Sequence, residues 1–406
     1  MDLLFLSGSA DVGGAERSLL DIMASLRSGR PGWRLHLVTP GAGALVEEAR
    51  ALRVSTAVIP FGLALARLGE PGVGGGADLA HLLVRLARTA GPLASYVRHL
   101  RDHLRVVQPD IIHTHGLKAH LFAAWANPGS SRVLWHLHDY VGRRRASATV
   151  LRRSLARCAG IVANSVSVAD DARRTLGEDV PVVPVLNGVD LRRYAPNGPV
   201  ADLDAIAGRP AVAPGTIRVG LLATFGRWKG HATFIKACAQ LATDVPIQAY
   251  IIGAPLYATD GSQYSLADLK ALARDAGLAD RLTFTGYIAQ SDQALRALDI
   301  VVHASTEPEP FGLVIAEAMA CGRPIIVANG GGAREIVEPG VDALTHAPGD
   351  AAALAGRIRE LAQDARLRAA IGVAAREAAL QRFDRMRLAS ELIPLYERAC
   401  LQGAAA

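Results

Sequence analysis

The sequence predicts an α/β protein built from two parallel-sheet domains in tandem. Short apolar runs alternate with helical hydrophobic patterns along the whole chain, which is typical of βαβ units. The alternation stops after residues 187–190 and begins again near residue 217. A chain of 406 residues is long enough for two or three domains that each bury a core. In such tandem domains a ligand binds in the crevice between them, at the carboxyl ends of the strands.

The first half contains a series of apolar runs of strand length, separated by helical patterns. Strands are predicted at residues 3–7, 35–39, 56–60, 110–115, 133–138, 161–164 and 182–186. Between the first two, residues 15–26 place Leu19, Ile22 and Met23 on one face of an amphipathic helix. Residues 62–78 contain the run GVGGGAD, which is too rich in glycine to pack, and we expect a mobile loop or a lid there.

The second half repeats the pattern. Strands are predicted at 217–223, 246–253, 282–287, 300–305, 324–329 and 342–348, and helices at 231–241, 264–276, 290–298, 312–320 and 350–364. A final helical stretch over about 385–400 has no strand after it, so it is free to pack elsewhere in the molecule.

A linker is predicted between the two halves. Residues 196–215 are rich in Pro, Gly and Ala and lack a hydrophobic period, as linkers do. The predicted organisation is therefore 1–195, linker 196–215, 216–383, and a terminal helix in 384–406. Asp202 and Asp204 form a DxD pattern in this linker; such a pair can hold a metal, but a solvated turn is the better interpretation at this place.

Composition favours a cytoplasmic enzyme. The most apolar stretches are interrupted by charges before they reach the ~20 residues of a membrane-spanning helix. The N-terminus has an acid at position 2 and reads as a first strand rather than a signal peptide. The cysteines are scattered without a CxxC pair, which argues against a metal cluster and for a reducing compartment.

The net charge of +6 comes almost entirely from arginine. Arginines are dense over residues 143–157, where they could meet the inner face of an anionic membrane or an anionic acceptor, or simply form a solvated helix face. The basic residues are not interleaved with aromatic ones, so nucleic acid is not expected as a partner. Lysine is rare, which draws attention to Lys229.

The stretch 303–322, HASTEPEPFGLVIAEAMACG, holds the most informative acids. It runs from a strand through a proline-punctuated loop into a helix that is apolar all round except for Glu317. A helix without a polar face is normally buried, and a buried carboxylate needs a partner or a ligand. Glu309 lies beside the N-terminus of the same helix, where free amides attract anions. We therefore expect a ligand-binding turn here.

Other candidates follow strands in both halves. His113, His115 and His138 lie at the ends of two strands, where polar groups meet ligands, although their spacing makes no credible zinc site. Gly14, at a predicted helix start, would let a phosphate or sugar approach the backbone. The glycine pattern around it is not GxGxxG, so a dinucleotide cofactor is disfavoured.

The segment 223–231, ATFGRWKGH, runs from a strand through a loop into a helix. It carries Arg227 and Lys229 beside the helix start, a placement suited to a diphosphate. It lacks the pattern GxxxxGK[ST] and is not a Walker loop.

These motifs together resemble glycosyltransferase family 4, whose members are retaining enzymes with the GT-B fold. The resemblance rests above all on EPFGLVIAEAMACGRPIIVANGGGAREIV (309–337), in which two glutamates flank Phe-Gly with seven residues between them. Supporting matches are GGAERSLL (13–20), PDIIHTHG (109–116), HLHD (136–139), IVANS (161–165), VLNGVDLRRY (185–194), KGHATFIKA (229–237) and PGDAAALA (348–355).

The resemblance implies two Rossmann-like domains facing across a cleft. The first would bind the acceptor and the second the nucleotide sugar, with the terminal helix crossing back to the first domain. Glu317 would hold the ribose hydroxyls, and Glu309 would lie at the donor sugar and its leaving phosphate. The backbone amides of Phe311, Gly312 and Leu313 would cradle the sugar and phosphate.

The resemblance also implies roles for residues outside the helix. Lys229 and an arginine would neutralise the diphosphate, His138 would touch the hexose near its 6-hydroxyl, and Gly14 would approach donor phosphate or acceptor. The family usually places its arginine five positions before the lysine, where this chain has Thr224. Either Arg227 takes that role in a shortened loop, or Thr224 donates a weaker neutral hydrogen bond; we favour Arg227.

The predicted function is transfer of a hexose from a nucleoside-diphosphate sugar to a hydroxyl acceptor with retention of configuration, without a metal or other cofactor. The acceptor would be a lipid- or polysaccharide-linked sugar or a small metabolite. A nucleotide-sugar epimerase of the same fold and a non-catalytic sugar-nucleotide-binding protein are the alternatives. A dehydrogenase is disfavoured because the first glycine loop is wrong for a nicotinamide cofactor.

Overall fold

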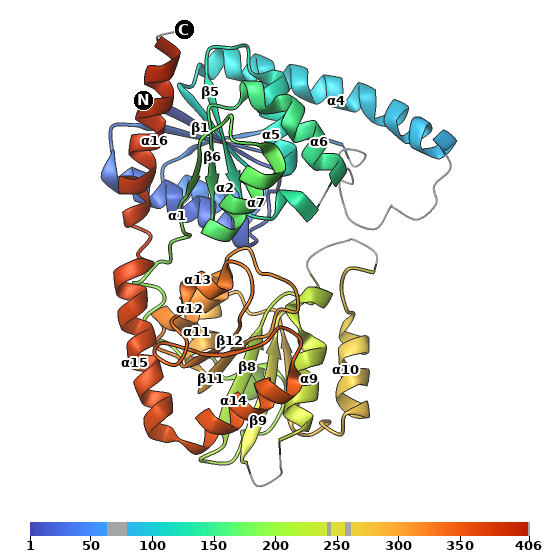
Figure 1. Cartoon of the computed structure of the whole chain (residues 1–406), viewed down its shortest axis with the longest axis vertical. Helices are drawn as coiled ribbons and strands as arrows, with labels where there is room; N and C mark the ends of the chain where they lie inside the picture. The colour runs from blue at the N-terminus through green and yellow to red at the C-terminus, as the bar shows by residue number, and fades with distance from the viewer. Residues whose placement is uncertain (63–78, 144, 242–244, 256–260, 405–406) are drawn as a thin grey trace. The chain divides into compact units, whose positions relative to one another are not determined.

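The computed structural model describes residues 1–62, 79–143, 145–241, 245–255 and 261–404. Its contacts divide the chain into two compact units, Met1–Gly188 with Arg385–Ala406, and Val189–Asp384. Figure 1 shows that each unit has a central sheet with helices on both sides. The predicted fold class, two parallel-sheet α/β domains, is confirmed.

The first unit has a seven-stranded sheet in the order β3-β2-β1-β4-β5-β6-β7, and all of its neighbouring strands run parallel. Every one of these strands overlaps a predicted apolar run. The strands are β1 (Asp2–Ser7), β2 (Arg34–Thr39), β3 (Ser55–Val58), β4 (Ile111–His115), β5 (Arg132–Leu137), β6 (Gly160–Ala163) and β7 (Val182–Pro184).

Two sets of helices cover the faces of this sheet. Leu4, Trp135 and their neighbours pack against α4 (Leu79–Val107), α5 (Leu117–Ala126), α6 (Arg145–Ser154) and α7 (Val166–Leu176). Leu3, Phe5 and Leu134 pack on the other face against α1 (Gly14–Gly29), α2 (Ala44–Ala51) and α16 (Arg387–Ala404). Helix α16 thus belongs to the core of the first unit, although it follows the second unit in sequence.

The second unit has a six-stranded parallel sheet in the order β10-β9-β8-β11-β12-β13. Its strands also overlap the predicted runs. They are β8 (Ile217–Leu222), β9 (Ile247–Ile252), β10 (Leu282–Gly286), β11 (Ile300–His303), β12 (Ile325–Ala328) and β13 (Leu344–His346).

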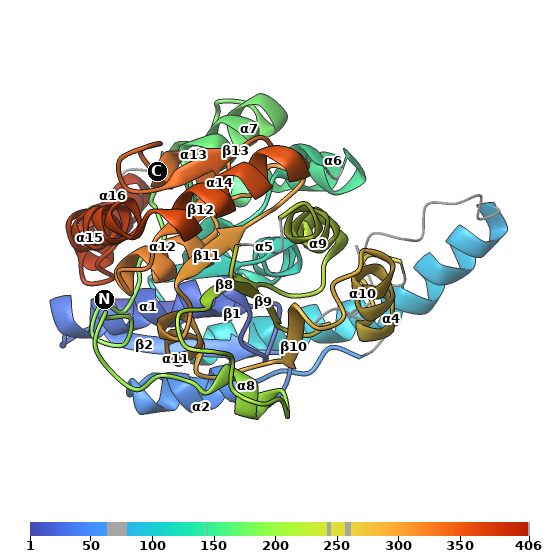
Figure 2. The same ribbon diagram turned by 90° about the horizontal axis from the view of Figure 1, so that it is seen from below.

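Helices again lie on both faces of the second sheet. Helices α9 (His231–Ala239), α10 (Leu266–Asp275) and α14 (Ala351–Gln363) share one core with the strands. Helices α11 (Ser291–Arg296), α12 (Leu313–Ala320) and α13 (Ala333–Ile336) lie on the other side, and α15 (Ala365–Arg382) packs on α12. Figure 2 shows the strands running between these two sets. None of the described helices is long and apolar enough to cross a membrane.

Residues 196–215, which the sequence predicts as a linker, lie within the second unit. They include α8 (Leu203–Ile206), whose N-cap is Asp202. Asp204 is buried, where it accepts hydrogen bonds from Arg218 (2.7 Å) and the Tyr250 hydroxyl (2.7 Å). Both acids of the DxD pattern are thus structural, one as a helix cap and one as the partner of a partly buried arginine and a buried phenol.

The predicted lid, 62–78, lies outside the described residues from position 63 onward.

Candidate functional site

Glu309 is the centre of a buried polar cluster in the second unit. Its carboxylate accepts two hydrogen bonds from the Lys229 ammonium, both of 2.8 Å. The Ser305 hydroxyl donates to Oε2 at 2.7 Å, and His303 Nε2 lies 3.4 Å from the same oxygen. Burial alone would raise the pKa of Glu309, but the charge of Lys229 and the hydrogen bonds from His303 and Lys229 hold it well below the usual range. Glu309 is therefore an anion at neutral pH.

The backbone brings Lys229 to this carboxylate through one close approach. Lys229 ends the short 3-10 helix η3 (Arg227–Lys229) that follows β8, and Gly230 comes next with φ of +77°. A Cβ on Gly230 would lie 1.8 Å from the carbonyl oxygen of Ala304, far inside van der Waals contact. Glycine at this position therefore lets the lysine turn lie against the carboxyl end of β11, where Ser305 and Glu309 follow.

Helix α12 begins directly after this cluster. Gly312 is its N-cap, with φ of +95°, a conformation that glycine adopts without strain. The side chain of Phe311 is buried and packs edge-on against Phe383. Phe311, Gly312 and Leu313 thus place successive backbone amides at the start of the helix, where such groups can bind an anion.

Glu317 lies one turn into α12 and is 8% exposed. Burial, and then the negative charge of Glu317, raise the pKa of Tyr194, which is also buried. The sequence predicts that this carboxylate has either a partner or a ligand, and the structure provides at least a partner.

The structure does not bring Arg227 into the Glu309 cluster. Its side chain is exposed, its Nε donates to the carbonyl of Gly261 at 2.9 Å, and its guanidinium lies 4.4 Å from the ring centroid of Tyr264. Thr224 is partly buried just after β8. Neither residue has a described contact with Glu309, and the assignment of the diphosphate-binding arginine stays a prediction.

The strand-end histidines of the first unit lie in a stack of imidazole rings. His138 Nε2 lies 2.9 Å from Nδ1 of His115, and the rings of His136 and His138 stack with centroids 4.2 Å apart. His113 Nδ1 lies 2.7 Å from the hydroxyl of Tyr396 on α16. Burial lowers the pKa of His138 to about 4 and, together with the charge of His138, that of His113 to about 3. These imidazoles are therefore neutral at physiological pH.

Three of these histidines are close enough together to consider a metal. His113, His115 and His136 each offer a ring nitrogen within 4.8 Å of the others. Zinc bound at about 2.0 Å from each nitrogen would need the nitrogens closer, at roughly 3.4 Å. The rings of His113 and His136 are nearly parallel, with 9° between their planes, and we interpret the cluster as a packed stack of neutral rings.

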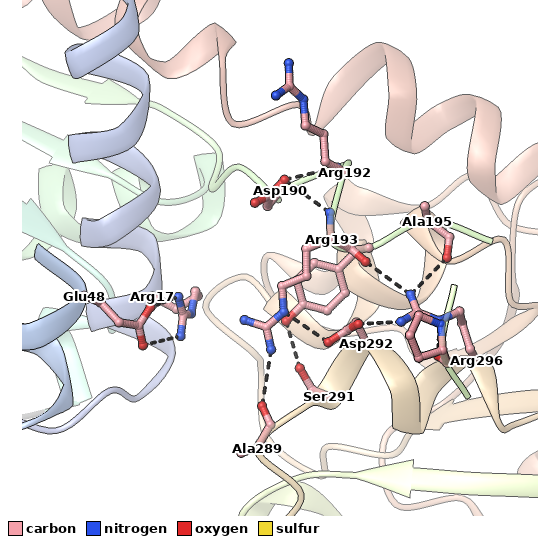
Figure 3. Close-up of polar contacts among 12 residues, drawn as sticks. Arg17, Glu48, Asp190, Arg192, Arg193, Ala195, Ala289, Ser291, Asp292 and Arg296 are labelled. Carbon is pink, nitrogen blue, oxygen red and sulfur yellow. Dashed lines mark hydrogen bonds and ion pairs between the residues drawn. The ribbon is translucent and has the colours of Figure 1, made fainter. Parts of the chain in front are cut away.

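Gly14 is the first residue of α1, and a Cβ at this position would meet nothing within 4 Å. The amide of Gly13 donates to the Glu16 carboxylate at 3.1 Å. Arg17 donates to both oxygens of Glu48 on α2, at 2.6 and 3.0 Å (Figure 3). The start of α1 is thus held by its own acid and by α2, and the role of Gly14 at a ligand stays a prediction.

Sequence reasoning missed three polar partners of the candidate site. Ser305 and His303 lie in the stretch that it singled out, but their bonds to Glu309 depend on how the loop folds back. Tyr194, whose pKa burial and the charge of Glu317 raise, belongs to the motif VLNGVDLRRY. The sequence therefore singled out this position but not its neighbourhood to Glu317.

Comparison with known proteins places this site in a family. The family model for glycosyl transferases group 1 matches residues 209–378, and the model for Glycosyltransferase Family 4 matches residues 12–193. Together the two models account for both units. The chain belongs to glycosyltransferase family 4. Its predicted fold, two Rossmann-like domains of the GT-B type, is confirmed as well, because a solved glycosyltransferase of Rickettsia africae aligns over 98% of each chain with a TM-score of 0.75 at 18% identity.

Curated relatives align with this chain over part of their length. The D-inositol 3-phosphate glycosyltransferase of Geodermatophilus obscurus is 33% identical over 196 residues, which cover 47% of this chain and 40% of that protein. The N-acetyl-alpha-D-glucosaminyl L-malate synthase of Bacillus anthracis is 27% identical over 175 residues, 43% of this chain and 44% of that one. The chain therefore spans less than half the length of these relatives.

A solved structure aligns over nearly the whole chain. HepE of Anabaena, in complex with UDP and glucose, is 27% identical with a TM-score of 0.79, and the match covers 98% of this chain and 99% of that one. The same protein has been solved with UDP-glucose, at 26% identity and a TM-score of 0.79.

Proposed function

We propose that this protein transfers a hexose from a nucleoside-diphosphate sugar to a hydroxyl acceptor, with retention of configuration and without a metal. The observation that carries the proposal is the partly buried Lys229–Glu309 ion pair beside the start of α12, which bears Glu317. A cation in the turn after β8, an acid in the loop after β11, and the amides and second acid of α12 are the groups that a sugar nucleotide requires.

Lys229 is proposed to bind the departing diphosphate of the donor. Its ammonium donates to Glu309, but 25% of the lysine side chain remains exposed. The ammonium can therefore also donate to a diphosphate oxygen. A preorganised cation and the amides of Gly312 and Leu313 would stabilise the negative charge that develops when the glycosidic phosphate bond breaks. Glu309, kept ionised by Lys229, would orient the sugar hydroxyls and offset positive charge at the anomeric carbon.

Retention is proposed to follow substitution on the front face of the sugar. The acceptor hydroxyl would attack from the side on which the diphosphate departs, and a phosphate oxygen would take its proton. Such a route needs no dedicated protein nucleophile. Arg227 or Thr224, Gly14 and His138 keep the roles that the family resemblance implies, at the diphosphate, at donor phosphate or acceptor, and at the hexose.

Donor binding can be tested with a panel of UDP-, GDP-, ADP- and TDP-sugars followed by thermal unfolding. A ligand that binds only the folded state raises the unfolding temperature. UDP-glucose is the first choice because HepE has been solved with it. A protein that none of the panel stabilises would contradict the proposal.

Glu317→Ala tests the ribose contact. Loss of charge-assisted hydrogen bonds is expected to cost about 2 kcal/mol, or about 30-fold in nucleotide affinity, measured by calorimetry. Glu360→Ala, which removes an exposed acid from α14, is the matched control and should bind as the wild type does. Equal nucleotide affinity of Glu317→Ala and the control would show that Glu317 does not bind the ribose.

The alternatives predict different products. An epimerase would release an isomerised sugar nucleotide in the absence of an acceptor, and a non-catalytic binding protein would bind nucleotide but never release a nucleoside diphosphate. Release of nucleoside diphosphate that depends on an added hydroxyl acceptor, followed by chromatography, supports the transferase and excludes both.

A further inference from the structure

A hollow in the second unit lies at the end of the sheet opposite to Lys229 and Glu309. It is lined by Asp299, just before β11, and by Pro324, just before β12, so it lies at the amino ends of these strands. Its volume is about 540 Å³, within the range of small-molecule pockets. The other lining residues come from the turn after α12, from α15 and from Pro196, and none of them belongs to the candidate site described above.

Two glycines bring α15 against the turn that follows α12. Gly322 in this turn has φ of +66°, and a Cβ on Gly372 of α15 would lie 2.6 Å from the carbonyl oxygen of Gly322. Arg368, Gly372 and Arg376 are spaced four residues apart on α15, so they share one face of the helix. This face and Arg323, which follows Gly322, therefore meet at the hollow.

Three arginines line the hollow, and each is anchored through one nitrogen. In every case Nη1 donates to backbone carbonyls: that of Leu298 for Arg323 (3.3 Å), those of Leu361 and Ala362 for Arg368 (2.7 and 3.3 Å), and those of Tyr194 and Ala320 for Arg376 (3.0 and 2.6 Å). Nε of Arg323 is buried and has no hydrogen-bond partner among the described residues. The guanidinium groups are thus held in place, while Nη2 of each is left for a ligand.

These arginines have no carboxylate partner within the part of the chain that the structure describes. Asp299 and Glu377 also line the hollow, but neither forms an ion pair with them, and Asp299 Oδ2 accepts the backbone amide of Arg218 at 2.8 Å. Burial lowers the pKa of Arg376, as expected of a cation that is partly withdrawn from water. The hollow therefore combines an excess of positive charge with two separate acceptors.

One wall of the hollow is fixed by a buried arginine. Pro196 belongs to a segment whose carbonyls accept hydrogen bonds from Arg296 on α11, at 3.1 Å for Arg193, 3.2 Å for Ala195 and 2.7 Å for Pro199. Figure 3 shows the bonds from Arg296 to Arg193 and Ala195. A wall held in this way is preorganised, so that a ligand does not have to order it on binding.

We propose that the hollow lined by Arg323, Arg368 and Arg376 binds the phosphate group of a small phosphorylated sugar or polyol. Guanidinium groups present paired donors that match phosphate oxygens. Asp299 and Glu377 can only accept hydrogen bonds when ionised, which suits them to hydroxyl groups on the rest of the ligand. The inference does not depend on the proposed function, because it concerns a second ligand at the other end of the sheet.

Calorimetry with glucose 6-phosphate, inorganic phosphate and glucose tests this site. Saturating UDP is present in each titration, so that the proposed donor site is filled. We expect glucose 6-phosphate to bind more tightly than phosphate, and glucose not to bind. No binding of glucose 6-phosphate, or binding only when UDP is left out, would overturn the inference. Equal affinity for glucose 6-phosphate and phosphate would contradict the role of the two acids.

Val373→Glu distinguishes this hollow from other places that attract anions. Val373 lines the hollow and is 61% exposed, so the change adds a negative charge without removing a side-chain hydrogen bond. We expect glucose 6-phosphate to bind about 10-fold more weakly or worse. Leu380→Glu is the matched control, because Leu380 lies on the same helix, is 49% exposed and does not line the hollow. Equal affinity in the two variants would overturn the inference.

Arg368→Ala tests the arginines directly. Loss of charge-assisted hydrogen bonds should weaken glucose 6-phosphate binding by roughly 10- to 100-fold. Arg366→Ala, which removes an exposed arginine from the same turn of α15, should bind as the wild type does. Urea unfolding shows whether both variants fold, and Val373→Glu takes the place of Arg368→Ala if that one does not. Equal weakening in both arginine variants would indicate non-specific attraction and contradict the inference.

Discussion

At the level of single residues, Lys229 and Glu309 form an ion pair with only 25% and 10% of their side chains exposed. Removal of one partner would leave a charge in a site from which water is largely excluded. Lys229→Ala is therefore expected to lower the free energy of unfolding by about 3 kcal/mol and to depress turnover at saturating donor more than it weakens acceptor binding. Denaturant unfolding and steady-state kinetics measure the two effects.

The control for this variant is Lys236→Ala. Lys236 is exposed on α9, a short distance along the chain from Lys229. Its replacement removes the same charge and should change neither stability nor turnover. A near-wild-type rate for Lys229→Ala would remove the lysine from the proposed mechanism.

The site residues differ in how far the sequence could predict them. Glu309 and Glu317 were predictable because a carboxylate in an apolar segment requires a partner or a ligand. Arg227 was favoured because of its charge and its distance along the chain from Lys229, but in the structure its guanidinium lies over Tyr264. Which way a side chain points out of a turn depends on contacts with residues far away in sequence, here Gly261 and Tyr264, and no local pattern encodes that choice.

At the level of secondary-structure elements, the turn from η3 to α9 depends on Gly230. Gly230→Ala would place a methyl group 1.8 Å from the carbonyl oxygen of Ala304. The turn must then move away from β11 and take Lys229 with it. We expect a loss of more than ~3 kcal/mol in unfolding free energy and a large fall in turnover.

A control separates this clash from backbone strain. Gly277, after α10, has φ of +70°, and a Cβ at this position would meet nothing within 4 Å. Gly277→Ala should therefore cost only about 1 kcal/mol, the strain of a left-handed conformation, and leave turnover intact. Similar losses in both variants would show that the approach to Ala304 is not what places Lys229.

The histidine stack on β4 and β5 makes the first unit sensitive to acid. Burial, followed by the charges of neighbouring histidines, lowers the pKa of His136 well below 6.5 and that of His113 to about 3. The unfolded chain therefore binds more protons than the folded unit as the pH falls below 6.5. Stability is fully present above that pH and is lost below it, by about 1.4 kcal/mol per pH unit for each such histidine.

His136→Leu tests this origin of the acid sensitivity. Neither ring nitrogen of His136 has a hydrogen-bond partner among the described residues, so an apolar side chain of similar volume should not destabilise the unit at pH 7.5. Between pH 6.5 and 5 the slope of unfolding free energy against pH should become shallower by about 1.4 kcal/mol per unit. An unchanged slope, measured by urea unfolding, would place the acid sensitivity elsewhere.

Strands were easier to predict than helices. Each described strand in the two sheets lies within or overlaps a predicted apolar run, because strands buried on both faces read as continuous Val, Ile and Leu. Helix α15, by contrast, was not predicted. Its sequence is rich in alanine and arginine, and only a few positions, such as Ile371 and Ala375, are buried. The apolar face of α15 is therefore too narrow to produce a recognisable helical pattern of hydrophobic residues.

At the level of the whole molecule, the chain passes between its two units twice, after Gly188 and after Asp384. The second passage returns α16 to the first unit, where Tyr396 and Leu392 are completely buried. The sequence predicts a helix at this place with no strand to follow, but a free apolar face alone does not reveal which core it completes. That choice comes from the residues of α1, such as Leu19 and Met23, that share its cluster.

Matched core variants can show that each unit has its own stability. Leu392 in the first unit and Leu354 in the second are both fully buried, and replacement of either by Ala should cost about 2–5 kcal/mol. Hydrogen exchange followed peptide by peptide should show faster exchange in β1, β4 and α1 for Leu392→Ala, and in β8, β11 and α14 for Leu354→Ala.

UDP then identifies the unit that binds the nucleotide. If only the second unit binds UDP, a concentration of about 100 times the dissociation constant adds about 2.7 kcal/mol to that unit. UDP should therefore restore slow exchange in Leu354→Ala and leave Leu392→Ala unchanged. Equal restoration of both variants would show that the two units open together, and restoration of Leu392→Ala alone would place the nucleotide in the first unit, against the assignment of Lys229, Glu309 and Glu317.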